Sequence, residues 1–374
     1  MKAFVFPMAL VLGMIVGCKA HDQAASQTDA TAATSGPFSS QELQQFAALE
    51  PIDAHAHAFQ NDPAFYALFK KLNLHMVNIL VINDEGPDYK HLKTKIDNGW
   101  KFVEGSQGSA VFCTTFNPYK WSEHGYAADT NRQLDRDFAR GAVAVKIWKN
   151  VGMEIKDAKG NYLLPDDPVF EPIYKDIAAH NKTLIAHLAE PDSAWKPMDP
   201  ASPDYSYYQD HPLWYMNGKP NAASKQQILV ARDHVLELNP KLRVVGAHLG
   251  SMEADFNQLG QHLDKYPNFA VDMAARMPYV MMQPHADAIA FITRYQDKLL
   301  YATDNEFGSE EKGPVAASGW EGTYARDWRF LATNDTVEYG GRKFQGLALP
   351  ASILRKLYHD NAVKWIPGVV SAAH

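Results

Sequence analysis

The chain has 374 residues, 46% of them hydrophobic, and its formal net charge is −7 at pH 7. This acidic balance argues against binding nucleic acid, or an anionic membrane surface, through overall charge.

The first 17 residues have the composition of an export signal. Lys2 supplies one positive charge, and the uncharged apolar run FVFPMALVLGMIVG follows it. The run is too short for a membrane-spanning helix and fits a secretory signal. Its end, Ile15-Val16-Gly17-Cys18, resembles a bacterial lipobox, which implies cleavage before Cys18 and lipidation of Cys18. An ordinary signal peptide cut nearby is the alternative.

Residues 18–40 are rich in Ala, Ser, Thr, Gln and Asp, and this composition predicts a flexible tether. Lys19 rather than Asp follows Cys18, so we expect an exported lipoprotein in the outer membrane, facing the periplasm and anchored by its lipid alone. A lipidated Cys18 would leave no pair of cysteines for an intramolecular disulfide. The other cysteine, Cys113, lies in the apolar run SAVFCTTF and is expected to pack in the core.

Residues 41–374 predict one α/β domain. Eight apolar runs of β type recur along it: IDAHAHA, MVNILVI, AVFCTTF, AVAVKIW, TLIAHLA, RVVGAHL, FAVDMAA and LLYATDN. Helix-like segments alternate with them, at 62–74, 126–140, 168–181, 225–238, 252–266, 284–295 and 349–365. Near-continuous apolar strands indicate a parallel sheet, and eight β-α units predict a (β/α)8 TIM barrel with long inserted βα loops. No GxGxxG follows the first run, which removes the main reason to expect a dinucleotide-binding fold.

Polar residues interrupt these runs near their carboxyl ends, where barrel enzymes place their active sites. In the first run, residues two apart share a face of the strand, so His55 and His57 should project together. The later runs add four more polar residues: Lys146, His187, His248 and Asp304. One of them could be a hydrogen-bonded core residue, but six at corresponding positions predict a metal site.

This pattern resembles the amidohydrolase superfamily. The stretches AHLGS, ATDNEF and LPASILRKLYHDNAVKWI resemble its amidohydrolase-related branch, amidohydrolase 2, which includes aminocarboxymuconate semialdehyde decarboxylase and pyrone dicarboxylate lactonase. The resemblance implies one divalent metal, zinc with manganese as the alternative. Its implied ligands are His55, His57, His187 and Asp304.

The resemblance also implies catalytic roles. His248 would be the general acid/base, and Asp304 would both ligate the metal and accept a proton from the metal-activated water. In binuclear branches a lysine at the end of the fourth strand is carboxylated and bridges two metals, with His187 and His248 on the second ion. The other interpretation is an unmodified Lys146 that pairs with a substrate carboxylate or a neighbouring acid.

Three residues are candidates for substrate binding: Lys146, Arg276 and Trp148, although Trp148 could equally be a core residue. Two inserts should border the pocket, 192–223 with many aromatic residues and 308–346 with the hairpin-like stretch VEYGGRKF. A helix arginine such as Arg232 is more typical of a surface or a salt bridge.

The leading hypothesis is hydrolysis of an amide, ester or lactone in a small anionic substrate. Two alternatives remain: a metal-dependent decarboxylase of an unsaturated or aromatic acid, and a non-catalytic, tethered binding protein. We expect a small-molecule substrate and no nucleic-acid partner, with a homodimer as one option for the quaternary state.

The lipobox generates a direct prediction. Replacing Cys18→Ser should release the protein into the soluble fraction and abolish labelling by a fatty-acid probe, because the lipid is attached at this residue. Persistent labelling and membrane association of the variant would contradict the assignment.

Overall fold

The computed structural model describes residues 36–82, 90–308 and 310–370. The expected signal segment, Cys18 and the tether up to residue 35 lie outside these ranges. Within them, no helix combines the length and apolarity needed to cross a bilayer.

The main sheet is parallel and closes on itself. Its order is β8-β7-β6-β5-β4-β3-β2-β1-β9. The strands are β1 Ile52–Ala58, β2 His75–Ile79, β3 Ala110–Thr115, β4 Ala144–Ile147, β5 Thr183–Ala186, β6 Arg243–Gly246, β7 Phe269–Asp272, β8 Leu299–Leu300 and β9 Glu306–Phe307. β8 and β9 are two parts of one run that lies beside β1. Two hydrogen bonds join this run to β1: Ala54 N donates to Tyr301 O (3.1 Å), and Asp304 N donates to His55 O (2.8 Å). The predicted (β/α)8 barrel is confirmed.

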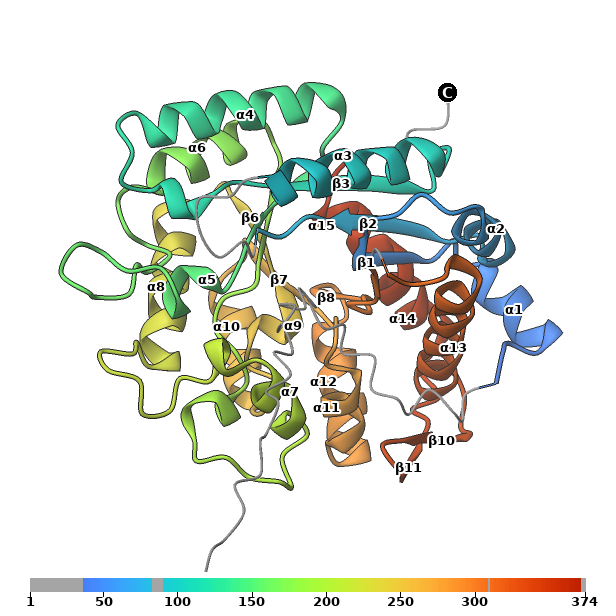
Figure 1. Ribbon diagram of the computed structural model, residues 1–374. Helices are drawn as coiled ribbons and strands as arrows, with labels where there is room; N and C mark the ends of the chain where they lie inside the picture. Colours follow the sequence, from blue (N-terminus) through green and yellow to red (C-terminus); the bar gives the residue numbers. More distant parts are fainter. Residues whose placement is uncertain (1–35, 83–89, 309, 371–374) are drawn as a thin grey trace, which may run out of the picture.

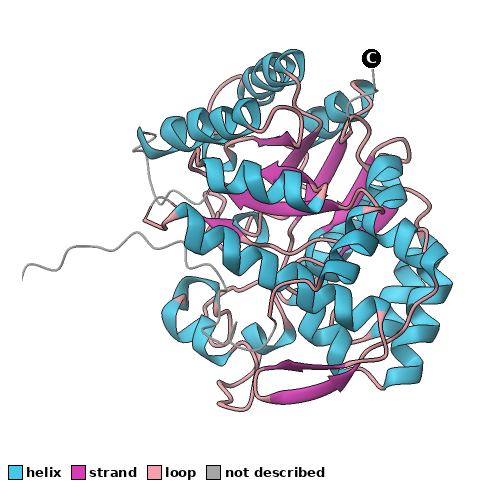
Figure 2. Cartoon of the chain, turned by 90° about the vertical axis from the view of Figure 1, so that its right-hand side faces the viewer, coloured by secondary structure: helices cyan, strands magenta, loops and turns pink. Residues whose placement is uncertain are grey.

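Helices surround the strands (Figure 1) and cover the sheet from outside (Figure 2). The α-helices are α1 Ser40–Ala47, α2 Pro63–Leu72, α3 Lys90–Gly105, α4 Tyr126–Arg140, α5 Asn150–Met153, α6 Glu171–Ala179, α7 Tyr205–Asp210, α8 Lys225–Leu238, α9 Ala247–Gly250, α10 Phe256–Lys265, α11 Met277–Met282, α12 His285–Tyr295, α13 Gly313–Ala332, α14 Ala351–Arg355 and α15 Asn361–Trp365. Short 3-10 turns η1 Pro118–Lys120, η2 Asp192–Trp195 and η3 Pro212–Trp214, and the π-helical turn η4 Lys356–Asp360, complete the elements. α4 and α8 begin and end where the sequence predicts, whereas α1, α3 and α13 were not predicted.

The barrel interior shows why the site residues point inward. One buried cluster draws apolar side chains from all eight strand runs and from α15, among them Ala144, Ile185 and Ala270. Side chains two residues apart on a strand share a face. Lys146, His187 and Asp272 each lie two residues beyond one of these three, so they continue the same inward columns.

β1 reaches the same result through a β-bulge. Ile52 and Ala54 belong to the interior cluster, but Ala56 and Ala58 belong to the outer core between sheet and helices. The pairing with β2 shifts register between Asp53 and Ala56. A bulge reverses the alternation, so the histidines beyond it face the interior while Asp53 bonds outward to α13.

The second insert contains the predicted hairpin. β10 Thr336–Tyr339 pairs antiparallel with β11 Arg342–Gln345. The turn residues Gly340 and Gly341 have φ values of 56° and 70°. Two successive positive φ values match a turn with the twist that hairpins prefer, which explains the Gly-Gly pair.

Two smaller expectations can also be compared with the structure. Cys113 is fully buried and packs in the barrel interior, as predicted. Arg232 is only 2% exposed, and its buried charge is satisfied because it donates to Gly250 O (2.8 Å) and pairs with Asp233.

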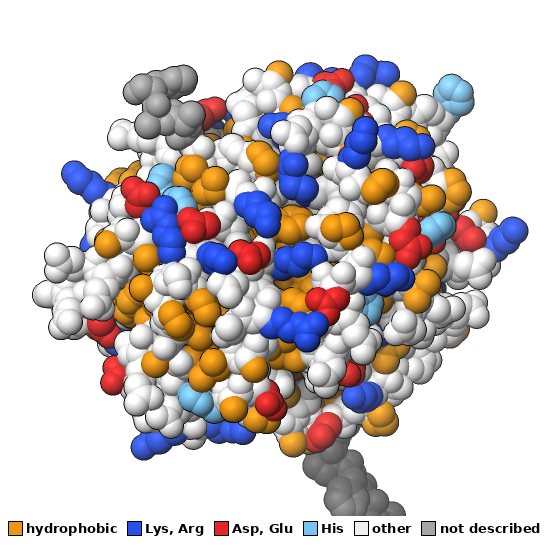
Figure 3. Space-filling view, turned by 180° about the vertical axis from the view of Figure 1, so that it is seen from behind, with side chains coloured by type: hydrophobic (Ala, Val, Ile, Leu, Met, Phe, Trp, Pro, Cys, Tyr) orange, Lys and Arg blue, Asp and Glu red, His pale blue; other side chains and the backbone are white. Residues whose placement is uncertain are grey.

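Over the face shown in Figure 3, basic and acidic side chains are interspersed, so this face carries no large field of one sign.

Candidate metal centre

Three histidines share one arrangement at the carboxyl end of the barrel. Each is nine-tenths or more buried and uses Nδ1 for an outward hydrogen bond. The partner of His57 is Ile79 O (2.7 Å), that of His248 is Ala274 O (2.9 Å), and that of His55 is Asp272 Oδ2 (2.8 Å). Carbonyl and carboxylate oxygens only accept hydrogen bonds, so Nδ1 carries the proton. The Nε2 atom of each neutral ring therefore keeps its lone pair.

These lone pairs converge on Asp304. The Nε2 atoms of His57 and His55 lie 3.2 Å and 3.4 Å from Asp304 Oδ1. Ligand atoms of His55, His248 and Asp304 all lie within 4.8 Å of one another. Acceptor atoms gathered in this way repel each other unless a cation lies among them. The donor set of imidazole nitrogens and one carboxylate therefore fits a divalent metal such as zinc.

Asp272 orients two of these histidines at once. Its Oδ2 accepts from His55 Nδ1, and its Oδ1 accepts from the backbone N of His248 (2.8 Å) and of Ala274 (3.2 Å). An outer carboxylate that fixes the tautomer of an imidazole is the usual support of a metal-binding histidine. Asp272 was missed in the sequence, although an acid interrupting the apolar run FAVDMAA is a visible signal.

His187 is placed differently from the other histidines. Its Nδ1 lies 3.1 Å from His248 Nε2, and its buried Nε2 has no hydrogen-bond partner. Glu190 Oε1 is 3.8 Å from that Nε2. Of the four predicted ligands, His55, His57 and Asp304 thus lie together, whereas His187 lies beside His248.

Lys146 faces the site from β4. It is 1% exposed, and its Nζ lies 3.1 Å from His55 Nε2, where it can donate into the lone pair. Burial lowers the pKa of Lys146 to about 8, although Asp272 and Asp304 oppose the shift. A sizeable share of this lysine is therefore uncharged under mildly alkaline conditions, and a neutral amine is nucleophilic.

The backbone near the site is strained. His248, Asp304 and Ala275 have φ values of 60°, 65° and 53°, in the left-handed region that non-glycine residues avoid. Each such residue costs on the order of 1–3 kcal/mol and persists only where its surroundings hold it. The left-handed conformation of His248 also explains why β6 ends at Gly246, before the predicted run RVVGAHL is complete.

Two buried cations next to the metal centre are paired with acids. Lys149 forms an ion pair with Glu190 and donates to Tyr207 Oη (2.6 Å). Arg276 is 4% exposed, and its Nε lies 3.6 Å from Glu253 Oε2 without a hydrogen bond. Each positive charge therefore has a carboxylate nearby, which lowers the cost of burying it.

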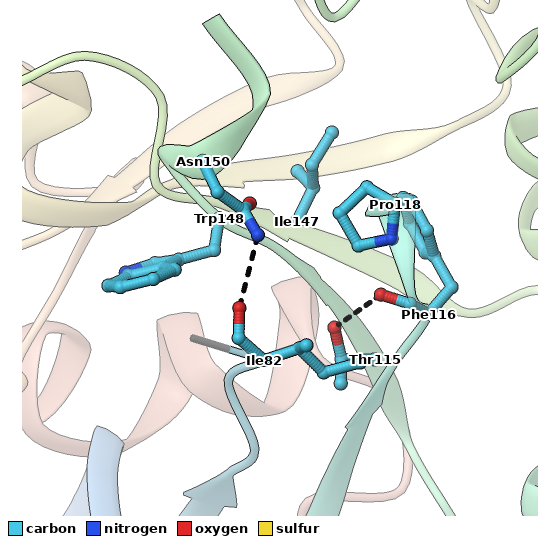
Figure 4. A pocket seen from close by; sticks show the side chains of 7 residues that line it. All are labelled: Ile82, Thr115, Phe116, Pro118, Ile147, Trp148 and Asn150. Atoms are coloured by element: carbon cyan, nitrogen blue, oxygen red, sulfur yellow. Dashed lines mark hydrogen bonds between the residues drawn. The ribbon is translucent and has the colours of Figure 1, made fainter. Parts of the chain in front are cut away.

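Trp148 borders a narrow pocket at the ends of β3 and β4 (Figure 4). The lining residues are Ile82, Thr115, Phe116, Pro118, Ile147, Trp148 and Asn150. Asn150 Nδ2 closes one wall by donating to Ile82 O (3.1 Å). The Trp148 ring also packs edge-on to His187, with 6.4 Å between ring centroids. Trp148 thus borders both the pocket and the histidine cluster.

Glu306 is another acid that the sequence reading missed. Burial raises its pKa to about 7. The nearby negative charge of Asp304 also raises this pKa, whereas His57 lowers it. The other grouping of potential ligands among the described residues, Asp135, Asp176 and His180, lies at the partly exposed surface of α4 and α6.

The family profile described as "Amidohydrolase" matches residues 123–367, well over half of the chain. The chain belongs to the amidohydrolase family. This family consists of metal-dependent enzymes, and the matched region contains His187, His248 and Asp304 but not the β1 pair.

Solved structures are similar to this amidohydrolase in fold. A Staphylococcus aureus protein assigned as an amidohydrolase has 12% sequence identity and a TM-score of 0.50, over 84% of this chain and 99% of that one. The 2,6-dihydroxybenzoate decarboxylase from Rhizobium has 14% identity and a TM-score of 0.48, over 84% and 98% of the two chains. A dihydroxybenzoic acid decarboxylase from Polaromonas sp. JS666, with bound manganese and 2-nitroresorcinol, has 14% identity and a TM-score of 0.49, over 84% and 96%. No curated protein matches the sequence.

The buried histidines predict acid sensitivity of the metal-free protein. Burial lowers the pKa of His248 to about 3 and also lowers the pKa values of His55 and His187. An unfolded histidine titrates near pH 6.5, so below that pH the unfolded chain binds protons that the folded chain does not. This stability is fully present above about pH 6.5, and each histidine removes up to ~1.4 kcal/mol per pH unit as the pH falls toward its folded pKa.

Melting temperatures of the metal-free protein between about pH 7.5 and about pH 5.5 would measure this loss. His248→Gln should flatten the pH dependence, whereas the control His234→Gln, at a half-exposed side chain on α8, should not. Equal slopes for the parent and His248→Gln would contradict the assignment.

Proposed function

We propose that this protein is a metal-dependent hydrolase that acts on an amide, ester or lactone of a small anionic substrate. The observation that carries the proposal is the convergence of three imidazole lone pairs on Asp304 in a buried barrel mouth. The proposal includes an outer-membrane lipoprotein facing the periplasm, which the lipobox-like sequence and the tether composition support.

One divalent ion, zinc or manganese, would be held by His55, His57 and Asp304, with His187 as the further ligand implied by the family resemblance. A bound ion would lower the pKa of a water molecule, and its positive charge would polarise the carbonyl group of a substrate. The buried surroundings strengthen this electrostatic effect, because little bulk water screens it.

Two residues of the chain, Asp304 and His248, would transfer protons during the reaction. Asp304 has a pKa well below its usual value, because His248 and His57 adjoin it and outweigh the opposing effect of burial. The side chain is therefore ionised, and its oxygens have the lone pairs with which to accept a proton from the attacking water. His248 is held through Nδ1 by Ala274 O, so its Nε2 faces the site as a base. The proton taken from the water can then pass to the leaving group of the scissile bond.

A second ion is the alternative arrangement. His187 Nδ1 and His248 Nε2 lie 3.1 Å apart and could ligate it together. Lys146 would then react through its neutral amine with carbon dioxide, with release of one proton, and the resulting carbamate would supply further oxygen ligands. The lowered pKa of Lys146 supports this chemistry, whereas its contact with His55 supports an unmodified side chain.

Metal content and turnover test the proposal together. The soluble domain, purified with zinc and manganese available, should hold at least about one equivalent of metal per chain. It should also hydrolyse members of a panel of lactones, esters and amides that carry a carboxylate. Metal far below one equivalent, with no activity restored on addition, would refute the function. Release of carbon dioxide from carboxylated aromatic acids, without hydrolysis, would identify a decarboxylase instead.

Two substitutions separate the roles of the ligands. His55→Ala should lose metal and activity together, because it removes a ligand nitrogen. His248→Ala should retain metal and lower turnover by roughly 10²–10⁴, the usual contribution of a positioned acid/base. Elemental analysis and kcat on the same preparations are the measurements. If His248→Ala also loses metal, the two-ion arrangement holds, and loss of carbon dioxide from Lys146 on acidification becomes the next measurement.

A further inference from the structure

Glu190 is a buried carboxylate at which three parts of the chain meet. It follows β5, three residues after His187, and its side chain is 4% exposed. Oε1 accepts from Lys149 Nζ, and Oε2 accepts from Tyr208 Oη (3.1 Å). The catalytic roles assigned above do not use this residue.

The Glu190–Lys149 pair holds the first insert against the barrel. Tyr207 and Tyr208 lie on α7, within the insert 192–223, and Tyr207 Oη accepts from Lys149 Nζ (2.6 Å). The ammonium also lies 4.6 Å from the ring centroid of Trp214 in the same insert. In Figure 1 the insert around α7 lies apart from the outer helices α4, α6 and α8. The ion pair is thus one attachment of the insert to the ends of β4 and β5, beside the hydrogen bond that Tyr279 Oη donates to Asp204 Oδ2 (2.8 Å) and the buried side chains of the insert.

The third group next to Glu190 is His187, a neutral imidazole whose single N–H proton lies on either Nδ1 or Nε2. His248 Nε2 is a lone-pair acceptor, because His248 Nδ1 donates to Ala274 O. Without metal, His187 Nδ1–H can donate to it across 3.1 Å, and His187 Nε2 is then left without a partner. When Nδ1 faces a metal, the proton must lie on Nε2, which points toward Glu190 Oε1 at 3.8 Å.

We propose that Glu190 is a positioning residue that stabilises the metal-binding tautomer of His187 and couples it to the insert 192–223. A small movement of the Glu190 carboxylate closes the 3.8 Å separation into a hydrogen bond. Because Tyr208 and Lys149 are bonded to the same carboxylate, metal loading then tightens the insert as well. This inference rests on the proposed metal-dependent function.

A matched pair of double variants tests the role without leaving a buried charge unpaired. Lys149→Met/Glu190→Gln removes both charges but keeps an amide oxygen that can accept from His187. Lys149→Met/Glu190→Leu removes both charges and the acceptor. The readouts are zinc affinity, by competition with a chelator, and amide hydrogen exchange in 192–223 with and without zinc.

We expect the Gln variant to bind zinc within about threefold of the parent and the Leu variant roughly 10–100-fold more weakly, as for other outer partners of metal ligands. Zinc should slow exchange in 192–223 in the parent and in the Gln variant, but not in the Leu variant. Tyr208→Phe, the control, should speed exchange in the insert and leave zinc affinity close to that of the parent.

Equal zinc affinities of the two double variants, with a parent that binds zinc, would overturn this inference and leave the proposed function intact. Glu190 would then be only the charge partner of Lys149. A parent that binds no zinc or manganese would overturn the proposed function and this inference with it. Melting temperatures of the metal-free variants show whether both are folded. If the Leu variant is unfolded, Lys149→Met/Glu190→Met replaces it.

Discussion

The site depends on one constraint: a buried neutral imidazole must give its single N–H to an acceptor, and that choice decides where its lone pair points. Asp272, on β7, makes this choice for His55 and also holds the backbone of His248, so one carboxylate ties together the ends of β1 and β6, which are not adjacent in the sheet. Ile79 O and Ala274 O do the same for His57 and His248 with backbone oxygens alone. Because these acceptors lie outside the ring of histidines, every remaining lone pair faces inward. The hydrogen-bond acceptors outside the candidate metal centre therefore fix the direction of its histidine lone pairs.

Closure of the barrel brings these acceptors to the right place. Asp53 accepts from the backbone N and Oγ1 of Thr303 (3.1 and 2.6 Å), from Tyr324 Oη (2.9 Å) and from His55 N (3.1 Å). These bonds join β1 to the run that ends at Asp304, and both to α13. The β1 bulge makes this possible, since it turns Asp53 outward while the two histidines stay inside. The cost of burying this acid is visible in its pKa, which burial raises to about 6.

The sequence predicted what depends on short-range periodicity. The shared face of His55 and His57 follows from the two-residue repeat of a strand, and the eight β-α units follow from recurrent apolar runs. The bulge at Asp53 could not be seen, because nothing in IDAHAHA distinguishes a regular strand from a bulged one. The association of Lys149 with Glu190, or of Arg276 with Glu253, needs the topology, since the partners come from different strand ends. The contact between His187 and His248 needs the topology for the same reason, because the two residues follow different strands.

Charge balance around the pocket bears on where an anionic substrate can bind. Lys149 donates to both Glu190 and Tyr207, so an entering carboxylate would have to displace bonds that already exist. Arg276 is different, because it donates to Ala275 O (3.2 Å), but its Nε and both oxygens of Glu253 have no hydrogen-bond partner. A guanidinium has five donors in a planar fork that suits a carboxylate. A substrate carboxylate could therefore accept from Arg276 Nε without displacing a hydrogen bond that already exists. We therefore propose that the negative charge of a substrate binds at Arg276, beside the end of β7, whereas Lys149 holds the insert 192–223.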